Sequence, residues 1–393
     1  MFNKNQINHL STYGLALFFF LVPFEYPLAD LISISPLRIV SLLAMGLAVL
    51  DIFIQERMRF DYRFLYVLAW LLYCLITSFW AIDQARFQSY FSLYMNNALM
   101  FLLFATISFN KYETKILKKA MVCGVVALLL YMTFVPGAVI YSDYQNRLTL
   151  NAGKDGLDQN YLAALMLIAF GLVFYSFCNN QQKRALKVLS IVFCLAIAYY
   201  ILLTGSRSGL ISLLLIMLLN INMSWKTRLS IGVPVVLLLV VVFPIVAQYI
   251  PQRLLERFSL SALTGQESES GTRLVIWGKA LESLQGVELL FGYGTGASQT
   301  IIGNVLENGM DMAIHNHYLA MLVEFGVIGF CLINYPILKM YKMLFKKDRA
   351  VAIGFTGILL MSFFVDVVTT KFFWSAMILL SVCFSVYSTD SIN

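Results

Sequence analysis

The chain has 393 residues, of which 60% are hydrophobic and 12% are charged, and its formal net charge at pH 7 is +7. Soluble globular proteins carry about 25% charged residues, so this composition excludes an ordinary soluble enzyme. The positive charge comes from Lys and Arg in short loops between apolar runs, and we expect no nucleic-acid partner.

Apolar runs of about the length that crosses a bilayer, roughly 20 residues, recur from end to end. They lack the alternation of a membrane strand, so we predict an all-α polytopic membrane protein. The whole chain, 1–393, is expected to form a single integral membrane domain. About twelve spans are predicted, at 12–28, 37–54, 64–81, 89–109, 120–140, 160–178, 188–204, 208–223, 229–249, 316–338, 351–368 and 372–388.

The distribution of Lys and Arg among the short loops sets the predicted orientation. With the N-terminus inside, the cytoplasmic segments carry most of these residues, as the positive-inside rule requires. Both termini are then cytoplasmic. One long loop, 250–315, lies outside between spans nine and ten, and we expect its interfacial helices to form part of an active site.

The first polar features in chain order precede span six. Arg147, in NRLTL, lies on the predicted outer side and is a candidate ligand for an anion. Asp158 and Asn160, in GLDQNYLA, open span six from the outside. An Asp before a helix is also a routine N-cap, so a structural and a substrate-binding role both stay open here.

The motif TGSRSG, 204–209, separates two apolar runs with almost no loop between them. Arg207 within it faces outward, against the positive-inside bias. A guanidinium fork matches the oxygens of a phosphate, and small neighbours such as Ser206 leave backbone N–H groups accessible. We predict that Ser206 and Arg207 bind a phosphate-bearing substrate; the alternative is a snorkelling Arg at a helix end.

The long loop contains a second candidate anion ligand, Arg273, in SGTRLVIW. The segment that follows, WGKALESLQGVELLFGYG, predicts one amphipathic helix with Trp277, Leu281 and Leu284 along one face. It ends in a Gly-rich turn around Tyr293. An amphipathic segment with aromatic residues beside a membrane often lies in the interface.

Two of the three histidines stand at the start of span ten, in AIHNHYLA. His315 is the best candidate for catalysis. Because the positive end of a helix disfavours imidazolium, His315 is expected to be neutral near pH 7, as a general base must be. Asn316 is expected to fix the ring or contact substrate hydroxyls, and His317 is a second candidate.

Ionisable residues within the last spans are functional candidates because charge in a membrane is costly. Asp366 lies between the last two spans and is expected to bind substrate, although a pair with Lys371 is the structural alternative. Glu324 lies deep in span ten, on roughly the same helix face as His317. The six cysteines fall in apolar runs without metal-ligand spacing, and we expect neither a metal nor a cofactor.

Four of these motifs together resemble the O-antigen ligase and polymerase superfamily. His315-Asn316, nine residues, then Gly326-Val327-Ile328-Gly329 is similar to the His-Asn-x9-Gly-x-x-Gly pattern of O-antigen ligases. TGSRSGL resembles the Ser-Arg-Ser-Gly turn of the superfamily. SGTRLVIW followed by LFGYGTG resembles its Arg-x-x-x-Trp and Gly-x-Gly loop, which adds Tyr293 to the predicted substrate-binding residues.

The resemblance implies a metal-independent, inverting glycosyltransferase of the C-type architecture in the bacterial inner membrane. Its donor is a glycan on undecaprenyl diphosphate, and its active site faces the periplasm. Carried onto this chain, His315 deprotonates the acceptor hydroxyl while Arg207 and Arg273 bind the diphosphate leaving group. The implied partners are a lipid-linked repeat unit or a lipid A core as acceptor, with a chain-length regulator and a flippase in the same pathway.

The sequence leaves three functions open. RLTLNAGKDGLDQNYLA resembles the polymerase branch and favours a polysaccharide polymerase. The His-Asn motif keeps an O-antigen ligase as the alternative. A lipid-linked oligosaccharide transporter is a further alternative, but such a protein places charge along a path through the membrane, whereas this chain gathers it at one outer mouth.

Overall fold

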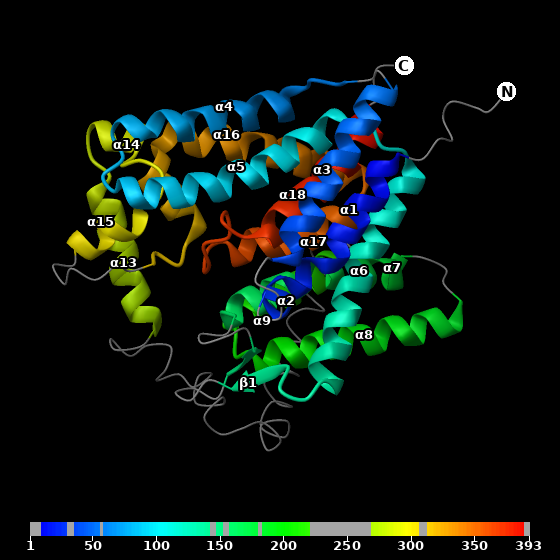
Figure 1. Cartoon of the computed structure of the whole chain (residues 1–393). Helices are drawn as coiled ribbons and strands as arrows, with labels where there is room; N and C mark the ends of the chain where they lie inside the picture. Colours follow the sequence, from blue (N-terminus) through cyan, green and yellow to red (C-terminus); the bar gives the residue numbers. More distant parts are fainter. Residues whose placement is uncertain are drawn as a thin grey trace. The chain divides into compact units, whose positions relative to one another are not determined.

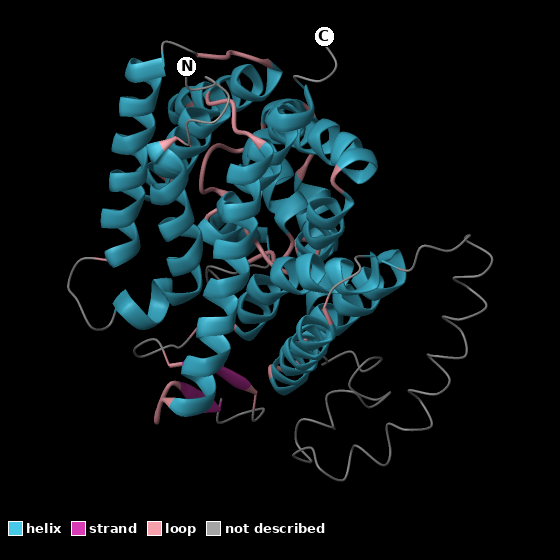
Figure 2. Cartoon of the chain, turned by 90° about the vertical axis from the view of Figure 1, so that its right-hand side faces the viewer, coloured by secondary structure: helices cyan, strands magenta, loops and turns pink. Residues whose placement is uncertain are grey.

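The computed structural model describes residues 9–29, 35–55, 58–141, 147–151, 157–179, 183–220, 269–305 and 313–388. Helices make up nearly all of this described chain, with one short two-stranded sheet (Figure 2). Their bounds are α1 Leu10–Leu21, α2 Glu25–Ala29, α3 Pro36–Gln55, α4 Tyr62–Ile76, α5 Gln84–Thr106, α6 Lys111–Phe134, α7 Gln159–Asn179, α8 Arg184–Leu203, α9 Arg207–Asn220, α13 Glu269–Ser283, α14 Val287–Phe291, α15 Ser298–Val305, α16 His317–Lys347, α17 Arg349–Met361 and α18 Lys371–Ser388.

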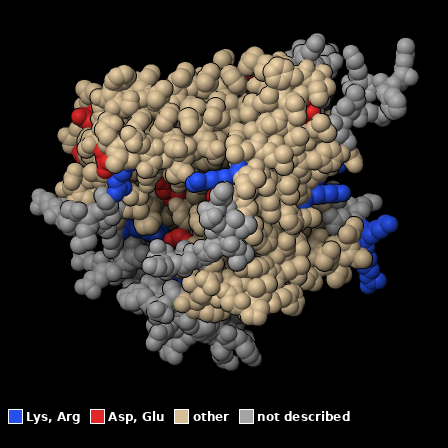
Figure 3. All heavy atoms as spheres, in the orientation of Figure 1, with Lys and Arg blue, Asp and Glu red and all other residues tan. Residues whose placement is uncertain are grey.

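Seven of the described helices are long and apolar enough to cross a membrane. They are Pro36–Ile54, Tyr62–Phe79, Lys111–Phe134, Gln159–Asn179, Arg184–Leu203, His317–Lys347 and Lys371–Ser388. On the face drawn in Figure 3 the described surface carries few Lys, Arg, Asp or Glu atoms, as a lipid-facing surface requires. The prediction of an all-α membrane protein is confirmed.

Several predicted spans differ from the helices found. The run expected at 12–28 is the short helix α1, a 3₁₀ turn at Val22–Phe24 and then α2. The helix expected at 316–338 extends to Lys347, and that expected at 351–368 ends at Met361. The span predicted at 229–249 and residues 250–268 of the long loop lie outside the described residues. The count of twelve therefore stays a prediction.

The chain divides into two compact units. One contains residues 1–124, 273–352 and 362–393, and the other contains 125–272 and 353–361. We call them the histidine unit and the arginine unit, after the predicted site residues His315 and Arg207 that they contain.

The core of the histidine unit is aromatic. Trp70 on α4 is fully buried, and its ring centroid lies 5.4 Å from that of Tyr94, 5.8 Å from that of Phe325 and 5.9 Å from that of Trp374. These residues come from α4, α5, α16 and α18. In Figure 1 α4, α5 and α16 run side by side, with α14 at one end of α16. The core therefore fixes the position of α16 at Phe325.

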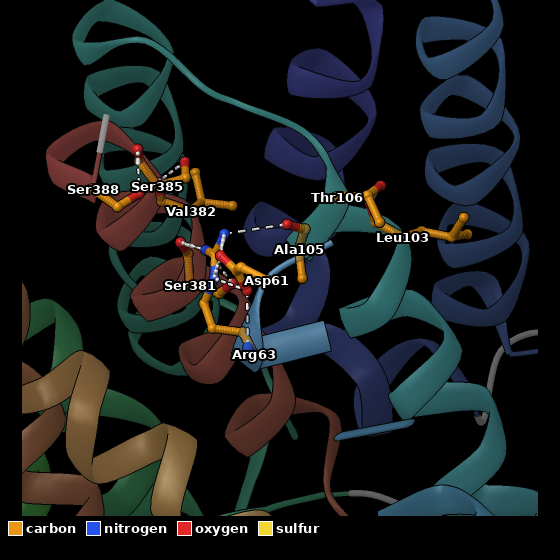
Figure 4. Close-up of polar contacts among 9 residues, drawn as sticks. All are labelled: Asp61, Arg63, Leu103, Ala105, Thr106, Ser381, Val382, Ser385 and Ser388. Carbon is orange, nitrogen blue, oxygen red and sulfur yellow. Dashed lines mark hydrogen bonds and ion pairs between the residues drawn. The ribbon is translucent and has the colours of Figure 1, made fainter. Parts of the chain in front are cut away.

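A buried arginine ties three helices of this unit together. Arg63, in the first turn of α4, is 1% exposed. Its guanidinium donates to Asp61, to the Ser381 carbonyl at 2.5 Å and to the Ala105 carbonyl at 3.2 Å (Figure 4). Because a buried charge needs a partner for each donor, this network locks α4, α5 and α18 in register.

The third histidine, His9, lies at the capped N-terminus of α1. It precedes α1, and its backbone N–H and ring Nδ1 both contact Glu113 Oε1, at 2.6 and 2.7 Å. Asp51 accepts from the Ser11 N–H at 2.7 Å. Two carboxylates from other helices thus satisfy N–H groups that open α1, as helix termini require.

The arginine unit packs helices closely through glycine. A Cβ added at Gly171 on α7 would lie 2.4 Å from the Cα of Gly354 on α17, so only glycine allows these backbones to approach. Beside α7, strands β1 (Val139–Tyr141) and β2 (Leu148–Leu150) pair antiparallel, with Ile140 opposite Thr149. This hairpin holds Arg147 at the start of β2.

Candidate functional site

Helix α16 is broken at Gly326. This residue has φ +59° and ψ −168°, which lies in a region open only to glycine. The break removes the normal helical partners of three carbonyls before it, those of Val323, Glu324 and Phe325. In a membrane protein such groups must be satisfied by other protein donors.

The Gly-rich turn of the loop supplies two of these donors. The Tyr293 N–H donates to the Val323 carbonyl and the Gly294 N–H donates to the Glu324 carbonyl, both at 2.9 Å. The Tyr73 hydroxyl donates to the Phe325 carbonyl at 3.2 Å. The loop is thus hydrogen-bonded to the bend of α16. Gly329, the second glycine of the predicted motif, also has a structural role, because a Cβ there would lie 2.9 Å from the Tyr73 ring.

His315 stands one residue before the N-cap of α16, in a strained conformation. With φ +51° it is the one described non-glycine residue with positive φ. Left-handed backbone costs an L-residue about 1–2 kcal/mol, so its surroundings must enforce it.

Hydrogen bonds on both sides of His315 enforce this conformation. The Trp277 Nε1–H donates to the Ile314 carbonyl at 3.0 Å. The Asn316 side chain accepts from the Leu319 N–H at 3.1 Å, and the His317 N–H donates to the Ser362 carbonyl at 2.8 Å. The flanking residues are buried, whereas the His315 side chain is partly exposed. The imidazole is therefore presented from a rigid backbone.

His317 and Asp366 lie together in the same unit. His317 Nδ1 is 3.5 Å from Asp366 Oδ1, an ion-pair distance when the ring is protonated but longer than an ordinary hydrogen bond. His317 is 2% exposed and packs 5.3 Å from the Phe373 ring centroid. Lys371 pairs with Glu25 at 2.6 Å. The pair of Lys371 with Asp366, the structural alternative, stays a prediction.

The loop helix differs from its prediction. One amphipathic helix was expected over 277–294, but α13 ends at Ser283 and α14 begins at Val287, with Gly286 at φ +59° between them. Ile276, Ala280 and Leu284 form the buried face, whereas Leu281 is 55% exposed. Arg273 lies on α13 one turn before Trp277 and is partly exposed.

The Tyr293 hydroxyl has a structural partner. It donates to the Ser283 carbonyl at 2.6 Å and so closes the C-terminus of α13. Burial raises the pKa of Tyr293 and the nearby Glu288 carboxylate adds to the shift, so the phenol stays a neutral donor at physiological pH. Its predicted role in substrate binding stays a prediction.

Glu324 is satisfied within the protein. Its carboxylate is 1% exposed, and it accepts from Ser298 at 2.7 Å and from Tyr94 at 3.1 Å. Sequence reasoning missed Tyr73, Tyr94 and Ser298, because no motif marks a hydroxyl that serves one carbonyl or carboxylate. The only signal was their position as polar residues next to or within apolar runs.

The other predicted residues gather in the arginine unit. Arg147 is buried, and its Nε donates to the Thr204 carbonyl at 2.8 Å while an Nη reaches Asn160 Oδ1 at 3.4 Å. Ser206 Oγ donates to the same Asn160 oxygen at 2.8 Å. Arg207 is the first residue of α9 and is partly exposed. Buried polar groups thus fix the backbone from which Arg207 projects.

Asp158 is the N-cap of α7. Its Oδ1 accepts from the Asn160 N–H at 2.7 Å and from the Tyr161 N–H at 3.3 Å. Of the two roles left open for this residue, the cap is the one observed.

The predicted site residues therefore form two groups. Tyr293, Arg273, His315, Asn316, His317 and Asp366 belong to the histidine unit, and Arg147, Asn160, Ser206 and Arg207 belong to the arginine unit. Within each group, motifs far apart in the sequence are joined by hydrogen bonds.

Residues 191–333 match the O-antigen ligase family model. The resemblance of this chain to the O-antigen ligase and polymerase superfamily is thereby confirmed. The matched segment is less than half of the chain. It contains Arg207, Arg273, Tyr293 and the His315 motif, and it leaves out Arg147, Asn160 and Asp366. No curated protein matches the chain.

Proposed function

We propose that this protein is a polysaccharide polymerase of the bacterial inner membrane. It transfers a growing glycan from undecaprenyl diphosphate to the sugar of another lipid-linked repeat unit, at the periplasmic face and without a metal ion. The family match supports a lipid-linked glycan as substrate, and the membrane-type helices support an integral membrane protein.

The observation that carries this proposal is the strained backbone of His315. Strain that the surroundings enforce is typical of residues whose side chain must be held in one place for chemistry. Here Trp277, Asn316 and His317 anchor the residues around His315, while His315 itself is partly exposed. A merely structural histidine at this point would be replaced at lower strain by glycine or asparagine.

In the proposed reaction the His315 imidazole accepts the proton of an acceptor hydroxyl. The acceptor oxygen then forms a bond to the anomeric carbon as the bond from that carbon to the diphosphate oxygen breaks. The diphosphate leaves with the electron pair, and the configuration at the anomeric carbon inverts. Removing the proton as the bond forms contributes typically about 10²–10⁴-fold to such a rate.

Arg207 and Arg273 are the proposed ligands of the leaving diphosphate. Their guanidinium groups would stabilise the charge that develops as the donor bond breaks. Arg147 is held by the Thr204 carbonyl and Asn160, so we assign it a supporting role in orienting the TGSRSG turn.

An O-antigen ligase is the second candidate, favoured by the description of the matching family. It would use the same donor and the same base but pass the glycan to a lipid A core. The two differ in the acceptor alone, so the acceptor is the variable to test.

The test uses purified protein in detergent with a synthetic undecaprenyl-diphosphate repeat unit. With no other acceptor, a polymerase gives a ladder of products on a gel. A single transfer that requires added lipid A core makes the protein a ligase. No product under either condition refutes glycan transfer and favours a transporter.

A further inference from the structure

Helix α5 carries polar residues where a membrane helix is usually apolar. Ser92, Asn96 and Asn97 lie near the middle of Gln84–Thr106, and α5 is long enough to span a bilayer but is absent from the seven apolar spans. A polar side chain that faces lipid is unfavourable, so such residues face a partner or a polar cavity. The question is what these three face.

They line a cavity within the histidine unit. Its volume is about 430 Å³, within the range of roughly 300–1,000 Å³ typical of ligand sites. The first turns of α3 and α18 supply other parts of its wall. Asn97 is 6% exposed and lines the cavity, yet its side chain has no hydrogen bond to any described residue. The Asn97 amide has an NH₂ group that donates and a carbonyl oxygen that accepts. Because buried polar groups are normally hydrogen-bonded, it calls for a polar ligand.

The cavity wall is cationic. Lys371 contributes one charge, which Glu25 offsets at 2.6 Å. Arg38 contributes a second, and it makes no ion pair among the described residues. Ser35, next to it in the wall, has a buried hydroxyl without a partner in the described structure. Amides, hydroxyls and one uncompensated guanidinium suit a hydroxylated ligand with a negative charge.

The cavity adjoins the segment that carries Asp366. Residues 362–370 connect α17 to α18; Ser362 and Asp366 contact His317, and Thr369 lines the cavity. Only Val367 and Val368 thus separate Asp366, which contacts His317, from Thr369 in the cavity wall. Arg38 and Lys371 both fall in segments predicted to lie on the outer side of the membrane.

We propose that this cavity binds the sugar of the acceptor, with an anionic substituent of that sugar at Arg38. Asn96 and Asn97 bind its hydroxyl groups. That the bound sugar is the acceptor rests on the proposed glycan transfer. Binding of a sugar in the cavity does not depend on turnover. The headgroup of an anionic phospholipid shares this chemistry and is the occupant that the experiment must distinguish.

The test measures binding to the full chain in nanodiscs of phosphatidylcholine. The probes are a disaccharide that ends in glucuronic acid and its neutral counterpart, cellobiose, titrated by saturation-transfer-difference NMR. Arg38→Gln and Asn97→Leu should each raise Kd for the acidic disaccharide about tenfold, the effect of losing a hydrogen bond to a charged or buried group. Arg38→Gln should raise the Kd for cellobiose by a smaller factor than the Kd for the acidic disaccharide.

Two matched variants control for folding. Arg59→Gln changes an exposed arginine outside the cavity, and Asn334→Leu changes an asparagine of α16 that is 9% exposed and donates to the Phe330 carbonyl. Both should leave Kd unchanged. Equal Kd in all variants, or equal weakening in the controls, overturns the proposal.

A second arm separates the two occupants and the two proposals. In one outcome the wild type retains phosphatidylglycerol that Arg38→Gln loses, while neither binds the disaccharide. That result would show that the occupant is a lipid and would overturn the proposal of an acceptor site. In the transfer assay Arg38→Gln should raise KM for the acceptor about tenfold while kcat is unchanged, a loss typical of ground-state binding. No transfer by the wild type would refute the proposed function, and with it the acceptor, while the Kd comparison would still establish the sugar site.

Discussion

Replacing Gly326 by Ala tests whether the bend of α16 depends on its contact with the loop. An added Cβ would lie 2.3 Å from the carbonyl carbon and oxygen of Leu290, a distance that no real Cβ contact tolerates. The backbone at φ +59° and ψ −168° costs alanine about 1–3 kcal/mol. Displacing α14 would break the bonds from Tyr293 and Gly294 to α16, at about 1 kcal/mol each. The free energy of unfolding should therefore fall by about 3–5 kcal/mol.

Gly46→Ala is the matched control, because Gly46 lies inside α3 with nothing within 4 Å of an added Cβ. Alanine there should stabilise the helix by up to about 1 kcal/mol. The assay is the fraction of purified protein that stays monodisperse by size-exclusion chromatography after heating, across a temperature series. A Gly326→Ala protein that is as heat-resistant as Gly46→Ala would refute the reasoning.

Other changes have defined outcomes. Asn316→Ala removes the N-cap of α16 and should lower stability by about 1 kcal/mol in the same heating series. Arg63→Ala leaves the Ser381 and Ala105 carbonyls without their donor and should cost about 3 kcal/mol or more, seen as loss of folded protein at expression temperature. Arg207→Ala and Arg273→Ala should each weaken binding of the lipid-linked donor in a direct titration. Arg207→Lys should restore binding only in part, because lysine lacks the bidentate fork of arginine. Normal donor affinity in both alanine variants would refute the assignment of these arginines to the diphosphate. Added chelator should leave transfer unchanged.

Hydropathy predicted the fold class because each apolar run must satisfy its own backbone in lipid. It was less accurate where polar side chains interrupt a run. Helix α5 is long enough to span a membrane, but it carries Ser92, Asn96 and Asn97, which line a cavity. A sequence does not show which face of a helix meets that cavity.

The candidate site was predicted by residue type and spacing, but its construction was not. His315, Arg207 and Arg273 were chosen because their chemistry suits a diphosphate donor. Two features of the site depend on contacts between segments about thirty residues apart. One is the positive φ of His315, and the other is the hydrogen bonding of carbonyls freed at Gly326 by the turn at Tyr293. Periodicity within one segment carries no signal for such contacts, as the break between α13 and α14 also shows.

The most direct test of the account compares the wild type with His315→Ala and His315→Asn in the repeat-unit assay. Asparagine accepts left-handed backbone readily, so His315→Asn keeps the local fold while removing the base. We predict that both variants bind the lipid-linked donor as the wild type does but form no ladder of products. A ladder from His315→Asn at a rate near that of the wild type would contradict the claim that His315 is the catalytic base.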